Sequence, residues 1–128
     1  MNTITVICCF NFKVTYAKRM KKYKSPITGH LDITIIKNES EFEGGIEYWN
    51  DVLIHGDPQG LRSLANLLLK LADLDQGTVV GLPVGAREHY HLRPKFDLSN
   101  SSQQVIVGRL DANGTGVFYD SYIPKEST

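Results

Sequence analysis

One amphipathic helix fixes the centre of this chain and limits what can surround it. Asp57 is a favoured N-cap residue, and Pro58 suits the first helical position because its missing N–H would have no intrahelical partner there. Gly77 helps to end the helix. The apolar side chains between them cover an arc of about 200°: Leu61, Leu64, Ala65, Leu67, Leu68, Leu69, Leu71 and Ala72. So wide an apolar face predicts a helix pressed deeply onto a sheet, with little of it left for solvent.

The segments on both sides of the helix read as strands, because apolar and polar residues alternate in most of them. The predicted strands cover residues 3–16, 31–35 and 46–54 before the helix, and residues 78–82, 87–93, 104–110 and 117–119 after it. The turn at residues 111–116 contains Asn113-Gly114, which tolerates positive φ. The order β-β-β-α-β-β-β-β predicts an α+β protein: one domain over residues 1–128, with one helix packed on a mostly antiparallel sheet.

The composition is that of a soluble protein and excludes several classes of partner. Lys plus Arg equals Asp plus Glu, at 14 each, so no bulk charge indicates nucleic acid or a membrane surface. No apolar run is long enough to span a bilayer. Cys8 and Cys9 are adjacent, and on a strand they would point to opposite faces, so they make a poor disulfide. With no Cys-x-x-Cys spacing and no signal-peptide pattern, we expect a reduced, cytoplasmic protein without a cofactor.

The charges are unevenly placed along the chain. A basic segment contains Lys13, Lys18, Arg19, Lys21, Lys22 and Lys24. An acidic segment contains Glu39, Glu41, Glu43, Glu47, Asp51 and Asp57, with Trp49 among the carboxylates. Such blocks are usually solvated surface. The alternative is that the acidic segment is a docking surface for a basic partner, with Trp49 as an aromatic contact.

A second suggestive feature is the stripe Arg87, His89, His91 and Arg93, which would share one face of a strand. The His-x-His spacing lets two imidazoles reach one metal ion, and His55 is a further candidate ligand. Two permanent positive charges on the same face disfavour a cation, however. The glutamate that cupins carry shortly after the second histidine is also missing here.

Two other interpretations of the stripe remain open. His89 and His91 could act as general acid and base, with Arg87 or Arg93 steadying a phosphate, in a metal-free ribonuclease-like arrangement. Alternatively, the stripe is a solvated or partner-facing sheet face, since polar side chains commonly cover the open side of an antiparallel sheet. We favour this last interpretation, because no complete set of catalytic partners accompanies the histidines.

Several motifs together resemble a small family of bacterial immunity proteins. They are the run His55-Gly56-Asp57-Pro58-Gln59-Gly60-Leu61, the leucine-rich helix, the run from Leu82-Pro83 to Leu92-Arg93-Pro94, and the run Val107-Gly108-Arg109-Leu110-Asp111 with Gly114 and Gly116. The similar part covers roughly residues 51–119. The resemblance implies a non-enzymatic protein, encoded beside a polymorphic secreted toxin, which binds and neutralises that toxin in the cytoplasm of the producing cell.

The resemblance does not say which residues contact the toxin. We expect the acidic segment to do so, because a negative surface suits a basic nuclease toxin. The expected partner-binding residues are Glu39, Glu41, Glu43, Glu47, Trp49 and Asp51. The alternatives are an enzyme acting on a phosphate-containing substrate or RNA through His89 and His91, and a metal-binding protein. The sequence leaves the oligomeric state open.

Overall fold

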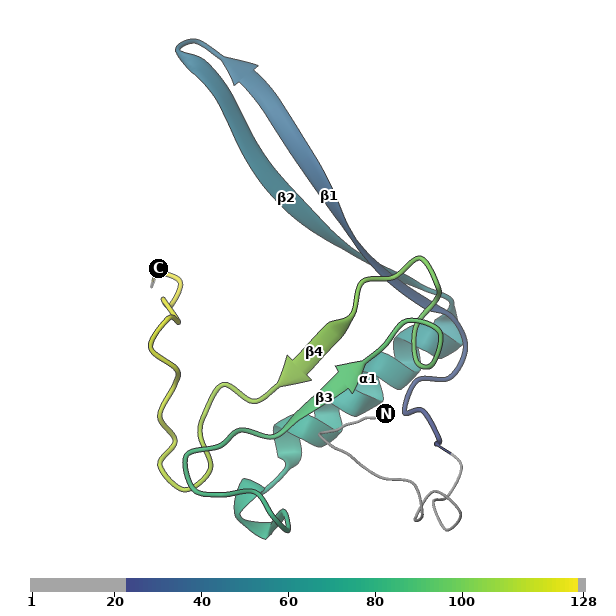
Figure 1. The fold of residues 1–128 in the computed structure, drawn as a ribbon, viewed down its shortest axis with the longest axis vertical. Helices are drawn as coiled ribbons and strands as arrows, with labels where there is room; N and C mark the ends of the chain where they lie inside the picture. The colour runs from purple at the N-terminus through teal and green to yellow at the C-terminus, as the bar shows by residue number, and fades with distance from the viewer. Residues whose placement is uncertain (1–22, 127–128) are drawn as a thin grey trace, which may run out of the picture.

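The computed structural model describes residues 23–126 (Figure 1). In these residues the first elements are the strands β1 (Leu31–Phe42) and β2 (Gly45–Gly56), and the helix α1 (Pro58–Asp73) follows. A short 3-10 helix, η2 (Gln76–Thr78), follows, and then the strands β3 (His89–Leu92) and β4 (Val105–Gly108). The α+β class, the antiparallel pairing and the single α-helix are as predicted. In residues 23–126 no helix has the length and apolar content needed to cross a membrane.

The number and arrangement of the strands differ from the prediction. The described part of the chain has four strands, whereas six of the seven predicted strands fall within it, and the four form two separate two-stranded sheets, β1–β2 and β3–β4. The predicted order β-β-β-α-β-β-β-β is therefore wrong there, and the order is β-β-α-β-β with the 3-10 helix after α1. The strand predicted over residues 3–16 lies outside the described residues.

Two predicted strands are absent because nothing pairs with them. Residues 78–82 continue from η2 into turns, and Val80 is 99% exposed. Residues 117–119 follow the predicted turn, but only one ladder-like bond, from the N–H of Ala112 to the oxygen of Val117, holds the two sides of that turn together. A short apolar run indicated the first strand and the preceding hairpin turn indicated the second, although a strand also needs a neighbour.

The β1–β2 hairpin is the most conspicuous feature of the fold. Its twelve pairs run without a bulge from Leu31 opposite Gly56 to Phe42 opposite Gly45. The chain reverses over two residues, with Gly44 at a φ of 106°, which glycine adopts without strain. Figure 1 shows that the far part of this hairpin projects away from the rest of the molecule.

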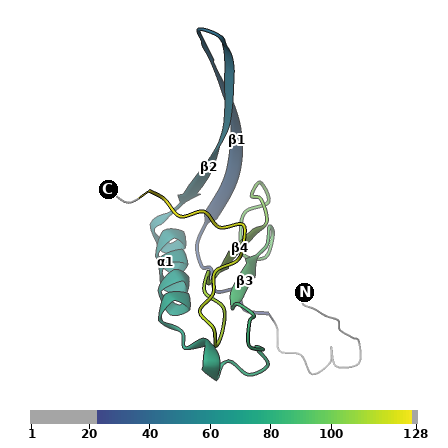
Figure 2. The ribbon, with the colours of Figure 1, turned by 90° about the vertical axis from the view of Figure 1, so that its left-hand side faces the viewer.

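The hydrophobic core lies where the root of the hairpin meets α1 and the β3–β4 sheet (Figure 2). Leu92 of β3 is fully buried, and Leu67 of α1 packs in the same cluster. The remaining buried members are Ile27, Leu31, Ile33 and Leu98. Partly buried residues from α1, β3 and β4 complete it: Leu64, Tyr90, Val105 and Val107. From β1 and β2 the core therefore includes only Leu31 and Ile33, and the rest of the hairpin lies outside it.

The helix is less buried than its apolar arc predicts. Only Gly60, Leu67 and Leu71 are buried in α1, while Leu68 is 44% and Leu69 61% exposed. The sheet of β3 and β4 has two strands of four residues each, so it covers a narrow stripe of the helix. The expectation of a helix with little surface left for solvent was therefore wrong, because it assumed a wider sheet.

The start of α1 is fastened to the residue that precedes β1. Asp57 is the N-cap, as predicted, and its carboxylate accepts hydrogen bonds from the N–H groups of Gly60 (2.7 Å) and His30 (3.0 Å). The N–H of Asp57 donates in turn to the oxygen of His30 at 3.1 Å. These N–H donors lower the pKa of the Asp57 carboxyl group. The contact ties the helix to the root of the hairpin.

Candidate functional site

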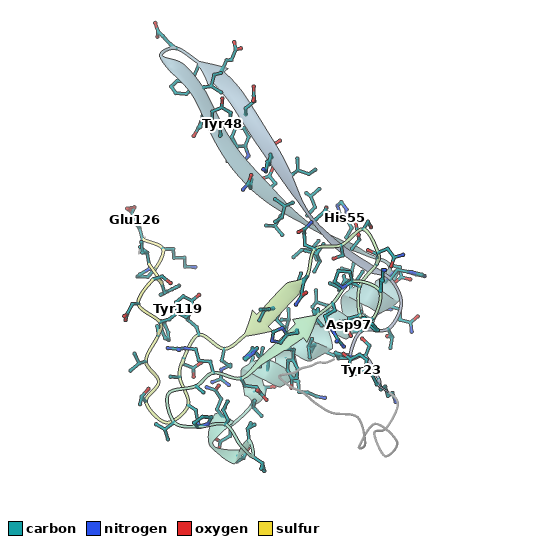
Figure 3. The ribbon with its side chains drawn as sticks, in the orientation of Figure 1. Tyr23, Tyr48, His55, Asp97, Tyr119 and Glu126 are labelled. Atoms are coloured by element: carbon teal, nitrogen blue, oxygen red, sulfur yellow. The ribbon has the colours of Figure 1, made fainter. Side chains whose placement is uncertain are left out.

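The outer part of the hairpin is a two-stranded arm with both faces in solvent. We define the arm as residues 35–52, from the pair Ile35–Val52 to the turn. Every side chain in it is exposed except that of Asn38, which is partly covered. Figure 3 shows Tyr48 far out along the arm and His55 at its root. A surface raised so far from the core contributes little to folding and is open to a partner.

Side chains of the arm divide between two faces, because directly opposed residues point the same way. We call the first the tyrosine face: Ile35, Lys37, Glu39, Glu41, Ile46, Tyr48, Asn50 and Val52. We call the second the tryptophan face: Ile36, Asn38, Ser40, Phe42, Glu47, Trp49 and Asp51. Both faces combine exposed apolar side chains with carboxylates, so neither is an ordinary solvated surface.

The structure brings all six predicted partner-binding residues onto the arm, but not onto one face. Glu39 and Glu41 lie on the tyrosine face, whereas Glu47, Trp49 and Asp51 lie on the tryptophan face. Glu43 occupies the turn between the strands. The side-chain amide of Asn38 donates to the carboxylate of Asp51 at 2.7 Å across the strands, and this bond orients that carboxylate beside Trp49.

The arm is strongly acidic, although the chain as a whole is neutral. It carries five carboxylates against the single lysine Lys37, a net charge of −4, while the formal net charge of the whole chain is 0. Like charges so close together repel, and folding gains nothing from placing them side by side. A partner with a basic surface would relieve that repulsion.

A serine-rich loop, residues 99–103, holds the root of the arm in place. The N–H of Ser99 donates to the oxygen of Leu31 (3.0 Å), and the N–H of Gln103 donates to the oxygen of Ile33 (2.7 Å). The hydroxyl of Ser102 accepts from the N–H of Ile33 and donates to its oxygen, both at 3.1 Å. The sequence indicated only a loop here, since hydroxyl side chains give no sign of the strand that they will pair with.

The same loop satisfies a carboxylate on β1. Ser99 and Ser101 both donate hydrogen bonds to Asp32, and these bonds lower the pKa of the Asp32 carboxyl group. His55 lies directly opposite Asp32 on β2, and its charge lowers that pKa a little further. The lowered pKa makes the Asp32 carboxylate a weak base, which is poorly suited to activating either serine as a nucleophile. The cluster therefore stiffens the root of the arm.

His89 and His91 lie on the open face of the β3–β4 sheet, as their spacing predicts. Their rings are 5.1 Å apart, centroid to centroid, in an edge-on arrangement. The Nδ1 atom of His89 is 2.9 Å from the oxygen of Arg87, which fixes the proton on Nδ1 and leaves Nε2 free for solvent. Loss of water around the ring, and then the charges of His89 and Arg93, lower the pKa of His91.

The two arginines do not continue this stripe. The strand covers only His89–Leu92, shorter than the predicted 87–93. Arg87 donates to the oxygens of Leu110 and Val117, and its guanidinium lies 5.6 Å from the centre of the Tyr119 ring. The guanidinium of Arg93 lies over the rings of Tyr23 and Phe96, at 5.1 and 4.8 Å. Both arginines thus bind parts of this chain.

This arrangement gives little support to the two chemical alternatives, a metal site and acid–base catalysis on a phosphate-containing substrate. In the part of the chain that the structure describes, no three His, Cys, Asp or Glu side chains are placed to hold a metal ion, so His55 does not join His89 and His91. A phosphate at the histidines would find the guanidiniums of Arg87 and Arg93 engaged with aromatic rings and backbone oxygens. Both histidine side chains are exposed.

A polar cluster below α1 holds the second half of the chain together. Gln76 is buried, and its side chain donates to the oxygen of Asp111 and accepts from the N–H of Glu88, both at 2.8 Å. Arg109 binds both carboxylate oxygens of Asp111 and caps the end of α1 through the oxygens of Leu71 and Leu74. These residues account for the Gly108-Arg109-Leu110-Asp111 run in structural terms.

Replacing Gln76 tests this cluster. In Gln76→Ala, the half-buried N–H of Glu88 and the half-buried oxygen of Asp111 lose their partners, so we expect the free energy of unfolding to fall by about 2 kcal/mol. The measurement is chemical denaturation of the purified protein, with Gln104→Ala, an exposed glutamine, as the control. Equal stability of the two variants would show that Gln76 does not hold the cluster together.

Residues 51–110 match the model of the family Immunity protein 32. No curated protein and no solved structure matches the chain. The matched segment begins at Asp51 and contains the last part of β2 together with α1, η2, β3 and β4. The tip of the arm, including Glu39 to Trp49, precedes it. The resemblance noted in the sequence is confirmed: through residues 51–110 this chain carries the pattern of an immunity protein family, Immunity protein 32.

Proposed function

We propose that this protein neutralises a cognate toxin by binding it directly through the arm, in the cytoplasm of the cell that makes both. The family match supports the general function of an immunity protein. We choose the arm as the binding surface because it is an exposed hairpin with a net charge of −4, and because Trp49, Tyr48 and Phe42 lie among its carboxylates. Aromatic side chains within a charged surface are typical of protein interfaces.

The charge of the arm favours a toxin with a basic surface. Enzymes that act on nucleic acids are basic where they contact phosphates, so a nuclease is the toxin class that suits this arm best. An acidic arm placed over such a surface would occupy the site that the nucleic acid needs. It would also speed association, because opposite fields attract before contact.

The position of the arm relative to the family match also supports this choice. An immunity protein must recognise its own toxin among many related ones, which requires a surface of its own. Five of the six expected contact residues, Glu39 to Trp49, precede the matched segment, and the structural clusters around α1 lie within it. Folding and recognition would then be carried by different parts of the chain.

The test is protection from the toxin encoded by the adjoining gene. Expression of that toxin domain alone in a bacterial host should stop growth, and co-expression of this protein should restore it. The purified pair should elute as one complex, with a dissociation constant measurable by calorimetry. Continued growth arrest together with separate elution of the two proteins would contradict the proposal.

A further inference from the structure

The outer edge of β2 offers a row of backbone groups that no other strand within residues 23–126 uses. On β1, the oxygens of Leu31 and Ile33 point away from β2, since both bind the loop at residues 99–103. In an antiparallel pair, directly opposed residues point their backbone groups the same way, either both toward or both away from the partner strand. The unbroken register therefore turns outward the N–H and oxygen groups of Ile46, Tyr48, Asn50, Val52 and Ile54.

The two edges of the hairpin are not equally protected. The β1 edge is covered at its root by residues 99–103, and the outward residues beyond it include the charged Lys37, Glu39 and Glu41. The outward residues of β2 carry no charge at all, and Tyr48 is 68%, Val52 61% and Ile54 51% exposed. Proteins usually blunt an exposed edge with charge, proline or a covering segment, because an open edge invites another strand. Over residues 46–54 there is no proline and no covering segment from residues 23–126, and the two charged residues, Glu47 and Asp51, are not among those whose backbone groups point outward.

Charge decides what kind of strand fits this edge. On the tryptophan face, Glu47 and Asp51 flank Trp49 along β2. If a second copy of this chain paired antiparallel about Asn50, its Asp51 and Glu47 would lie diagonally across from Asp51, at about 7–8 Å. A parallel, in-register copy would place each carboxylate beside its equivalent. Repulsion therefore disfavours a second copy, whereas a strand with basic side chains on this face would neutralise both carboxylates.

We infer that the β2 edge, residues 46–54, is completed by an extended segment of the toxin. This segment alternates apolar and basic side chains: the apolar ones pack beside Ile46, Tyr48, Val52 and Ile54, and the basic ones face Glu47 and Asp51. The inference rests on the proposed function and adds the mode of binding to it. Backbone hydrogen bonds supply affinity in such strand addition, and the alternating side chains supply specificity.

One pair of substitutions isolates the backbone contribution. Asn50→Pro removes an outward N–H at the centre of the edge, and Asn50→Ala removes the same side chain but keeps that N–H. Proline is tolerated at such positions, because the lost N–H does not bond to β1. We expect Asn50→Pro to bind the toxin domain of the adjoining gene about tenfold more weakly than Asn50→Ala, since a bond at a dry interface is lost.

The opposite edge supplies the matched control. Lys37 faces Asn50 across the hairpin, and its N–H points outward on the β1 edge. Lys37→Pro and Lys37→Ala should therefore bind the toxin domain equally well. Circular dichroism of all four variants establishes that the hairpin remains folded. If Asn50→Pro and Asn50→Ala bind equally well and the wild-type protein also binds, the toxin does not pair with the β2 edge, and the proposed function is left intact.

Amide hydrogen exchange tests the same edge without any substitution. In the free protein, the N–H groups of residues 46, 48, 50, 52 and 54 should exchange quickly, and the intervening ones, bonded to β1, slowly. Addition of the toxin domain should slow the first set and leave Lys37 and Glu39 unchanged. Slow exchange in the free protein that depends on concentration would indicate a second copy at the edge and overturn the inference. A wild-type protein that does not bind the toxin would remove both proposals.

Discussion

Reversing three charges on the arm, with Glu43→Lys, Glu47→Lys and Asp51→Lys together, should lower the rate of association with the toxin by about tenfold or more at low salt. The arm would change from a net charge of −4 to a positive one and would repel a basic surface. The dependence of the association rate on salt should flatten or change sign, because screening would no longer weaken an attraction. Stopped-flow or surface-plasmon measurements over a range of ionic strength report both quantities.

The control for this variant changes the net charge equally but elsewhere. Asp73, Asp120 and Glu126 are exposed carboxylates outside the arm, and their replacement by lysine adds the same charge to the molecule. We expect this second variant to retain most of the association rate. If the two triple variants bind alike, the overall charge of the protein matters and the arm does not. If the arm variant binds at the wild-type rate, the acidic surface is not where the toxin docks.

Gly60→Ala should lower the free energy of unfolding by about 3 kcal/mol. A methyl group at this position would lie 1.9 Å from the oxygen of His30 and 2.7 Å from its carbonyl carbon. Both are backbone atoms, so the helix start would have to move and the bonds between Asp57, His30 and Gly60 would be lost. At an ordinary exposed helix position the same change is stabilising by up to about 1 kcal/mol.

Thermal and chemical denaturation measure this effect directly. Gln59→Ala, one residue earlier in the same helix turn and exposed, is the appropriate control and should leave stability nearly unchanged. A Gly60→Ala variant as stable as the wild type, or more so, would show that the helix does not approach His30 this closely. Gly60, the last glycine of the run from His55 to Gly60, is needed because the helix backbone lies against the backbone of His30 at this position.

Local patterns in the sequence predicted local structure well. The N-cap at Asp57 is where its carboxylate and the following proline place it. Alternation predicted a strand over residues 46–54, and in β2 the alternate residues Ile46, Tyr48, Val52 and Ile54 share one face. His89 and His91 share a face for the same reason. In each case the residues that determine the local structure lie within a few positions of it in the sequence.

Features that depend on distant parts of the chain were not predictable in this way. Residues 36–42 of β1 place Lys37, Glu39 and Glu41 on one face and only two apolar residues, Ile36 and Phe42, on the other, because an arm in solvent has no buried side to impose a continuous apolar face. The apolar arc of α1 did not reveal that the sheet packed against it would have only two strands, joined by four residue pairs. Asp32 and Ser99 are 67 positions apart, and nothing in either neighbourhood indicated their hydrogen bond.

The arm's separation from the core has a consequence for how this protein can change over generations. A substitution beyond Ile35 disturbs no buried side chain, and exposed positions usually alter stability by no more than about 0.5 kcal/mol. Selection on mutations in the arm therefore acts on toxin recognition alone, whereas selection on mutations near Leu92 or Gly60 acts on the stability of the fold. Substitutions at the hairpin tip could therefore restore binding to a toxin that has diverged, while the rest of the molecule stays unchanged.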